Sequence, residues 1–427
     1  MGGTVGGVQP DGPQEPVSRT ADAEDAGIAL ANARWYFAGL AASLLGNSAM
    51  SLVAGIWVKE LSGSSAEAGL VSACIYAGTM GAPIAGLLAD GFPRRRLLLV
   101  LNLLSAATLL PLLLVSSSSL SWIVFVVMAL YGIEATLMDP AEDALFAQMF
   151  STEFRQRING WRLTIQETGR LVAPLLGAGL FELLGGGAVA ALDAATFVFA
   201  ALVITRLSTD DRKLSRSREP LTHSLTAGLR HVLRTPAIRP VAIATTLVMA
   251  LSGMGVAAQY SLVHGLGERP AFLGVLSALL GVGSIVASLT ASPIIRRHGE
   301  RTLALIGLVN FAAGNLLRAN HWLPAALIGT AVLGFALPYV FLATLNVAQR
   351  ATPNELQGRV TAALLFALFG PQALTQTIGS ALIAKLTYVQ IYAASAVLSL
   401  AIAGWLARAR TPSHIADDEA TRDDFER

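Results

Sequence analysis

Four carboxylates lie close together in an otherwise apolar stretch, YGIEATLMDPAEDALFAQ at 131–148: Glu134, Asp139, Glu142 and Asp143. At about 100° per residue along a helix, the last three share one arc, while Glu134 points elsewhere. Because a carboxylate inside a lipid-embedded helix is costly, it indicates a water-filled cavity, an ion pair or a functional site. The sequence therefore predicts ion or proton chemistry on this helix.

The next helical segment runs antiparallel and supplies cations. Its direction places Arg170 near the level of Glu134, at the middle of a membrane, and Arg162 level with Glu142, about 12 Å nearer one surface. We therefore expect two ion pairs between the helices. Glu167, three residues before Arg170, competes for that arginine.

Glu134 admits two interpretations. A buried carboxylate that meets an arginine in only one conformation can take up and release a proton, as proton coupling requires. A permanent salt bridge would only pin the two helices together. The residues that we expect to take part in proton coupling are Glu134, Arg170, Asp139 and Glu167.

Composition places these groups in a membrane protein. The 427 residues are 54% hydrophobic and only 14% charged, whereas soluble proteins carry about 25% charged residues. The net charge of +2 and the absence of a basic domain exclude nucleic acid as an expected partner. Cys74 is the single cysteine, which excludes an intrachain disulfide.

Apolar runs of about 20 residues are long enough to span a bilayer as helices, and these are too long for barrel strands. We predict an all-α membrane protein of twelve transmembrane helices. The spans are expected at roughly 35–58, 67–89, 97–115, 121–147, 158–183, 187–206, 238–262, 271–295, 302–318, 322–348, 359–384 and 388–408.

The predicted organisation has five parts. A Gly-, Pro-, Asp- and Ser-rich tail at 1–33, predicted to be disordered, precedes a six-helix bundle at 34–206. A polar connector at 207–237 leads to a second six-helix bundle at 238–408, followed by a tail at 409–427.

Lysine and arginine are distributed unevenly between the predicted loops, and positive loops face the cytoplasm. With the N-terminus inside, the outer loops hold only Lys59, Arg269, Arg318 and Lys385, whereas the inner side holds many arginines. We therefore expect both termini and the connector to be cytoplasmic, in a multi-pass protein of the plasma membrane.

An internal repeat relates the two bundles at an offset of about 202 to 206 residues. STEFRQRINGW at 151–161 aligns with PNELQGRVTAA at 353–363, and PLLGAGL at 174–180 aligns with QTIGSAL at 376–382. Two six-helix halves in the same orientation, related by a pseudo-two-fold axis, are typical of a transporter.

The loop GLLADGFPRRR at 86–96 resembles the loop signature of the major facilitator superfamily, through Gly86, Asp90, Arg94 and Arg95. The aligned loop, SPIIRRHGER at 292–301, keeps its glycine and its last arginine. In the first loop, glycine and proline replace a usual arginine and a usual second glycine.

DPAEDAL, RINGWRLTIQETGRLVAPLLGAGL and DAATF resemble the macrolide-efflux type of drug:proton antiporter within that superfamily. The resemblance implies that Glu142 or Asp143 is the partner of Arg94 in a gate; the alternative is a solvated helix end. Asp90 can accept from backbone N–H groups at a neighbouring helix N-terminus and act as a latch. Asp193, in the DAATF segment, is expected to be structural.

The second half contrasts with the first, because its predicted spans contain no Asp or Glu. Its polar groups are amides and hydroxyls. A cavity with this apolar wall suits an amphipathic organic molecule, and we expect Asn346, Gln372 and Gln376 to line it.

The sequence thus predicts a secondary transporter, acting as a monomer, that exports amphipathic small molecules in exchange for protons. A lipid-like or siderophore-type metabolite is the alternative substrate, and a nontransporting membrane sensor or scaffold is the alternative class. The absence of a GxxxxGK[ST] loop argues against an ATP-driven pump, and the absence of HExxH and GxSxG motifs argues against an enzyme. No cofactor and no metal site are expected.

Overall fold

The computed structural model describes residues 17–78, 92–207, 221–353 and 356–409. Within these ranges the regular structure is entirely helical. The elements are α1 (Val17–Ser62), α2 (Ser65–Ala77), α4 (Arg94–Leu109), η2 (Leu110–Leu114), η3 (Ser118–Leu120), α5 (Ser121–Met149), α6 (Thr152–Arg206), α7 (Leu221–Arg234), α8 (Arg239–Met254), α9 (Val256–Gly265), η4 (Pro270–Phe272), α10 (Leu273–Arg318), α11 (Leu323–Arg350), α12 (Gln357–Phe369), α13 (Gln372–Ile383) and α14 (Tyr388–Arg408).

Eight helices of the described part are long and apolar enough to cross a membrane. Two of them, α6 and α10, each consist of two helices joined at a glycine with positive φ, 79° at both Gly185 and Gly299. Glycine adopts this backbone conformation at little cost, so a single residue is enough to end one helix and begin the next. The protein is therefore a multi-pass membrane protein.

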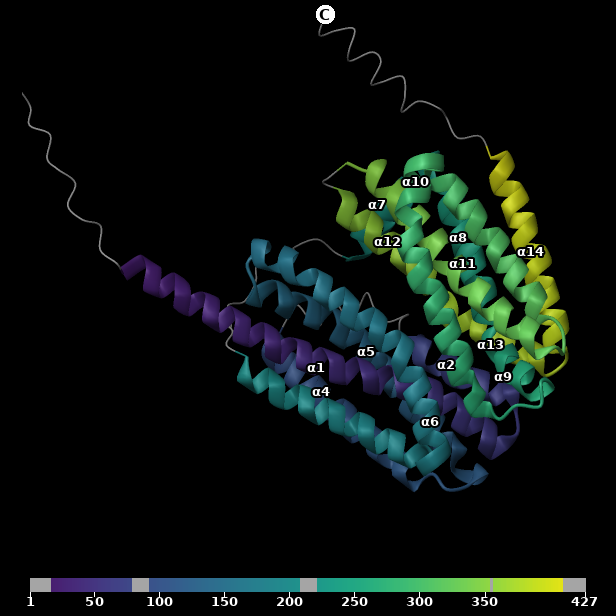
Figure 1. Ribbon diagram of the computed structural model, residues 1–427, viewed down its shortest axis with the longest axis horizontal. Coiled ribbons are helices and arrows are strands. Elements are labelled where there is room, and N and C mark those ends of the chain that lie inside the picture. The colour runs from purple at the N-terminus through teal and green to yellow at the C-terminus, as the bar shows by residue number, and fades with distance from the viewer. Residues whose placement is uncertain (1–16, 79–91, 208–220, 354–355, 410–427) are drawn as a thin grey trace, which may run out of the picture.

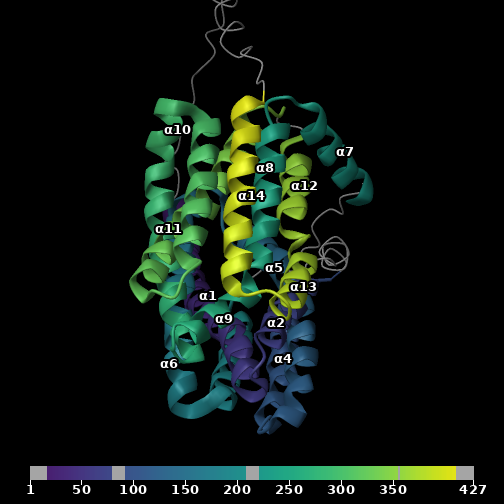
Figure 2. The ribbon, with the colours of Figure 1, turned by 90° about the vertical axis from the view of Figure 1, so that its right-hand side faces the viewer.

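The helices form two groups that Figure 1 shows as the arms of a V. We call α1 to α6 the first half and α8 to α14 the second half. The halves meet at one end, where α2 packs against α9 and α13, and α6 packs against α10. Figure 2 shows α2, α9 and α13 at this boundary. The start of α1 and the end of α14 lie at the opposite, spread end (Figure 1).

Small residues allow the close approach at the joined end. A Cβ on Gly69 of α2 would lie 2.6 Å from Ser380 Oγ of α13, and a Cβ on Gly274 of α10 would lie 2.7 Å from the Cβ of Ala178 on α6. The largest hydrophobic core runs through the first half and continues into this end of the second half, and two smaller, separate cores lie in the rest of the second half. The spread end is thus built from two independently packed bundles.

Two segments differ from the sequence-based expectation. α1 begins at Val17, inside the tail 1–33 that was predicted to be disordered, because ADAEDAGIALANA at 21–33 is rich in helix-forming alanine. The connector 207–237 contains the helix α7, which packs against α12. Its Val232 is buried, while Leu229 and Leu233 are exposed.

Candidate functional site

A cavity of about 340 Å³ opens among the helices of the first half. Residues of α1, α4, α5 and α6 line it. Its polar and charged lining residues are Ser43, Asn47, Ser105, Tyr131, Asp139, Glu142, Asp143, Arg162, Gln166 and Arg170. This cavity is lined by more charged side chains than the second recess described below.

The predicted arc of carboxylates on α5 faces this cavity. Asp139, Glu142 and Asp143 all line it, as their i, i+3 and i+4 spacing requires. Asp139 and Asp143 are exposed, and Glu142 is half-buried. Three acidic groups therefore surround one recess, within reach of solvent and of any molecule that enters it.

Arg162 of α6 forms its ion pair with Asp143 and not, as predicted, with Glu142. The guanidinium also lies 5.0 Å from the centre of the Phe146 ring, at cation–π distance. One residue is about 100° of helix rotation, so adjacent carboxylates turn toward different neighbours. Glu142 also lines a second recess beside Tyr36 of α1, whereas Asp143 faces α6.

Glu134 lies away from the cavity, and the predicted pair with Arg170 is not formed. Its side chain is 5% exposed and accepts a hydrogen bond from Thr108 of α4, with 2.8 Å between Thr108 Oγ1 and Glu134 Oε1. Oε2 has no hydrogen-bond partner. Five residues separate Glu134 from Asp139, a rotation of roughly 140°, which turns Glu134 toward α4.

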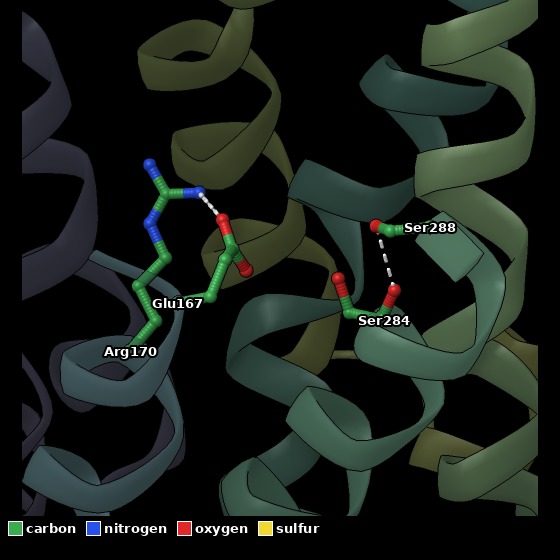
Figure 3. A network of polar contacts seen from close by, with 4 residues as sticks. All are labelled: Glu167, Arg170, Ser284 and Ser288. Atoms are coloured by element: carbon green, nitrogen blue, oxygen red, sulfur yellow. Dashed lines mark hydrogen bonds and ion pairs between the residues drawn. The ribbon is translucent and has the colours of Figure 1, made fainter. Parts of the chain in front are cut away.

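Arg170 instead pairs with Glu167 on its own helix, at 3.3 Å between Nη1 and Oε1. Glu167, predicted from the sequence to compete for Arg170, is thus its partner in this conformation. The Arg170 side chain is 69% exposed. Figure 3 shows this pair on α6 together with Ser284 and Ser288 of α10, the helix of the second half that packs against α6. The pair therefore lies near the boundary of the two halves.

Two residues of the predicted gating loop, Gly86 and Asp90, lie outside the residues that the structure describes. Arg94 is the first residue of α4. Arg95 donates from Nε to the carbonyl of Ile204 at 3.1 Å and from Nη2 to that of Thr205 at 2.7 Å. The positive charge of an arginine stabilises the last carbonyl groups of a helix, which form the negative end of its dipole. Arg95 therefore holds the end of α6 against α4.

The three amides predicted to face substrate from the second half are held differently. Asn346 is half-buried and donates to the carbonyl of Leu342 at 2.8 Å. Gln372 and Gln376 each have a buried Oε1 atom without a hydrogen-bond partner, and Gln376 is 3% exposed. None of the three amides lines the recesses described above.

Sequence reasoning missed two polar groups. Arg318, which was placed in an outer loop, is buried at the end of α10, where it donates to Tyr392 Oη at 2.8 Å and lies 4.5 Å from the ring centre. Tyr131 and Asn47, which nothing in the predicted site included, bond to each other and line the cavity. A mid-helix asparagine in an apolar run was the available signal for the second group.

The arrangement can bind and release protons and can hold an organic molecule. Asp139 and Glu142 form no ion pair with any residue of the described segments. Both line a recess that already contains two arginines, each paired to another carboxylate. Protonation of the two acids therefore changes the charge of the recess without breaking either ion pair.

Comparisons with known proteins agree with a transporter fold. The family model described as Major Facilitator Superfamily matches residues 36–267 and 241–424. No relative was found among curated proteins by sequence.

Among solved structures, the nucleoside transporter NupG superposes with a TM-score of 0.69 at 14% identity, covering 89% of this chain and 98% of that one. A bacterial homologue of the iron transporter ferroportin, in an inward-facing state, gives 0.68 at 16% identity, with coverages of 89% and 99%. A POT family transporter in complex with a thioalcohol-conjugated peptide gives 0.68 at 12% identity, with coverages of 87% and 94%. At these identities the similarity establishes the fold.

Proposed function

Because the chain belongs to the major facilitator superfamily, and is thus a membrane transporter and not an enzyme, we propose that it exports amphipathic small molecules in exchange for protons. The observation that carries the proposal is the acidic recess of the first half, in which Asp139 and Glu142 have no ion-pair partner among the described residues. Acids in such a recess can be loaded with protons from one side of the membrane and emptied to the other.

The proposed architecture has twelve spans in two bundles of six. Splitting α6 at Gly185 and α10 at Gly299 gives four spans, while α8 with α9 and α12 with α13 give one span each. The remaining six are α1, α2, α4, α5, α11 and α14. This division supports the predicted bundles at 34–206 and 238–408, joined by the connector at 207–237.

The proposed orientation places both termini in the cytoplasm, with the protein in the plasma membrane as a monomer. The arginine excess on the predicted inner side supports it. In this proposed orientation the spread end of the V, where α1 begins and α14 ends (Figure 1), faces the cytoplasm, so the conformation is open to that side. An exporter loads its substrate in that state.

Substrate and protons share the recess in the proposed cycle. Asp139 is the first candidate for coupling, because it lines the recess and is exposed. Arg170 and Glu167 lie near the boundary with α10, where a change in the packing of the halves can separate them. Glu134 remains a candidate whose access to a proton requires movement between α4 and α5, because it is buried against Thr108.

The gate is proposed at the cytoplasmic loop that contains Gly86 and Arg95, where Asp90 and Arg94 form a latch for the opposite, outward-open state. Glu142 and Asp143 lie at the cytoplasmic side of the recess and are the proposed acidic side of this gate. In the second half, Asn346, Gln372 and Gln376 remain proposed contacts for the polar groups of an amphipathic substrate.

Everted membrane vesicles test the proposed function directly. Vesicles from expressing cells, energised to make their interior acidic, should accumulate ethidium or radiolabelled erythromycin, and vesicles from cells with the empty vector should not. A protonophore should abolish the accumulation. Accumulation that survives collapse of the gradient would contradict proton exchange, and proton-driven movement out of the vesicles would contradict export. Failure of both probes to accumulate would contradict this substrate class.

A further inference from the structure

Asp193 of α6 is a fully buried carboxyl group that the proposed cycle does not use. It is 0% exposed. Tyr131 Oη lies 2.8 Å from Oδ2, and Thr196 Oγ1 lies 3.2 Å from Oδ1 and 2.8 Å from the backbone oxygen of Asp193. Within the described segments, no arginine or lysine forms an ion pair with it. An ionised carboxylate in this position would be buried without a counter-ion.

Tyr131 connects this buried acid to the cavity. Its hydroxyl oxygen is also 2.9 Å from Asn47 Oδ1. Tyr131 and Asn47 line the cavity, whereas Asp193 is not among the lining residues. Three oxygen atoms, one from each side chain, therefore form a continuous chain from the buried acid to the cavity wall.

The number of hydrogens in this chain of oxygen atoms links the protonation state of Asp193 to the orientation of the Asn47 amide. Two contacts between three oxygen atoms need two hydrogens, one in each contact. The tyrosine supplies one hydrogen and the asparagine oxygen supplies none. The second hydrogen must come from the carboxyl group, so in this arrangement Asp193 is a protonated acid that donates to Tyr131, and Tyr131 donates to Asn47.

The opposite protonation state needs a rotation of the asparagine amide, whose Nδ2 lies 3.5 Å from Ser43 Oγ. A serine hydroxyl can donate as well as accept, so it can bond to either end of the amide. When the Asn47 amide is reversed, its N–H group donates to Tyr131 and Tyr131 donates to an ionised Asp193. The backbone of α1 packs directly against the carboxyl group of Asp193 and leaves no space for a further side chain there. A Cβ on Gly46 would overlap the carboxyl group and lie 2.5 Å from Thr196 Oγ1. The site is therefore built for two states that differ by one proton.

The charged groups near this chain of oxygen atoms belong to α5 and α6. From α5, Glu134 lies within electrostatic range of the Tyr131 hydroxyl, and Asp139 lines the same cavity. The cations of the cavity belong to α6, where Arg170 pairs with Glu167 and Arg162 pairs with a carboxylate of α5. None of these charged groups forms an ion pair with Asp193.

We infer that Asp193 is a second proton-binding site of the transporter and that Tyr131 relays its proton to the cavity. On release, the O–H bond of Asp193 breaks and its proton moves to Tyr131 Oη, while the hydroxyl proton of Tyr131 passes to a water molecule in the cavity. Reversal of the Asn47 amide then restores hydrogen bonds on both sides of the tyrosine. Because Asn47 borders the cavity, a substrate that bonds to its amide favours one of the two states.

This inference rests on the proposed proton exchange, but its first test needs no substrate. Infrared spectra of the full-length protein in liposomes at neutral pH should contain the C=O stretching band of a protonated carboxylic acid. Because protonated Asp139 and Glu142 contribute to the same band, Asp193→Asn should remove one component of it and lower its intensity. The fold should stay intact, since the amide N–H replaces the acid as donor to Tyr131. The matched control is Asp143→Asn, which removes an exposed, ion-paired carboxylate and should leave the band in place.

The relay is tested by moving the liposomes into heavy water. The band should shift as the acid exchanges hydrogen for deuterium, and Tyr131→Phe should slow the shift while keeping the band. A wild-type spectrum without the band, or a band of unchanged intensity in Asp193→Asn, would overturn the assignment. An unchanged rate in Tyr131→Phe would remove the relay. If Asp193→Asn does not fold, the wild-type band and its exchange rate in Tyr131→Phe still decide.

The transport role is tested in the same liposomes by counting protons moved per ethidium molecule. Asp193→Asn should lower the wild-type ratio, and an unchanged ratio would overturn the role in transport. A wild-type protein that moves ethidium without protons would instead refute the proposed function. The infrared test requires no transport. Failure of the Asp193 inference can therefore be distinguished from failure of the proposed function.

Discussion

In the first half, Arg95 donates to the carbonyls of Ile204 and Thr205 at the end of α6. In the second half, Arg301 lies 206 residues later and donates at 2.6 Å to the carbonyls of two residues at the end of α14, Leu406 and Ala409. Both arginines hold the last helix of their own half. This shared role is structural support for the repeat found in the sequence.

The turns before these arginines differ. Gly299, two residues before Arg301, has a φ of 79°, whereas Pro93, two residues before Arg95, has a φ of −58°. Proline cannot adopt positive φ, so the backbone conformation two residues before the arginine differs between the halves. The arginine contact is therefore retained although this backbone conformation is not.

The helices that correspond by the repeat also differ in charge. α5 carries four carboxylates, and its counterpart α11 carries none between Leu323 and Arg350. α11 has neutral bonds instead: Thr344 Oγ1 lies 2.7 Å from Thr245 Oγ1, and Tyr339 Oη lies 2.7 Å from Thr290 Oγ1. Of these two helices, therefore, only the one in the first half carries carboxylates.

The largest expected effect comes from removing a carboxylate of α5 that lines the cavity. Asp139→Asn should reduce proton-driven efflux about tenfold or more, because it removes an acid that the proposed exchange requires. Asn346→Ala on α11 should change efflux by less than about twofold, because its amide bonds to its own helix. Gradient-driven dye accumulation in everted vesicles, normalised to protein amount, measures both. Equal losses in the two variants would show that the halves share the ion chemistry.

An intermediate effect compares two arginines, one in each half. Arg318→Met should lower the free energy of unfolding by about 1–3 kcal/mol, because it removes a buried hydrogen bond and a cation–π contact with Tyr392. Arg162→Met should cost at most about 1 kcal/mol, because its partner Asp143 is exposed. Thermal unfolding in detergent orders the two variants. A larger loss for Arg162→Met would place the stabilising cation in the first half.

The smallest expected effect concerns the repeated arginines. Arg95→Met and Arg301→Met should each destabilise the protein by about 0.3–1 kcal/mol, since each removes a cation from a helix C-terminus. Hydrogen exchange measured by mass spectrometry should report faster exchange at the end of α6 in the first variant and at the end of α14 in the second. Equal losses of stability would support an equivalent role of the two arginines, and a loss in only one half would contradict it.

Several features of the site follow from the sequence because they depend on one helix. The shared arc of Asp139, Glu142 and Asp143 needs only helical periodicity, and all three line the cavity. The competition of Glu167 for Arg170 is also local, and this pair is the one formed.

The pairs between helices could not be predicted from depth alone. Arg170 and Glu134 were assigned to the same level of the membrane, but level does not fix rotation about the helix axis. In the structure Glu134 turns toward Thr108 of α4. Arg162 likewise meets Asp143 and not Glu142.

The sequence by itself determined an all-helical membrane protein and the helix that carries the acids, because length, hydropathy and helical period are properties of single segments. Only the tertiary structure decided that Asp193, Tyr131 and Asn47 meet, and that Arg318 is buried. The first set of contacts joins three helices, and the contact of Arg318 with Tyr392 joins two. They depend on how each helix is rotated and how closely glycines such as Gly46 let neighbours approach, which packing sets for the whole bundle at once.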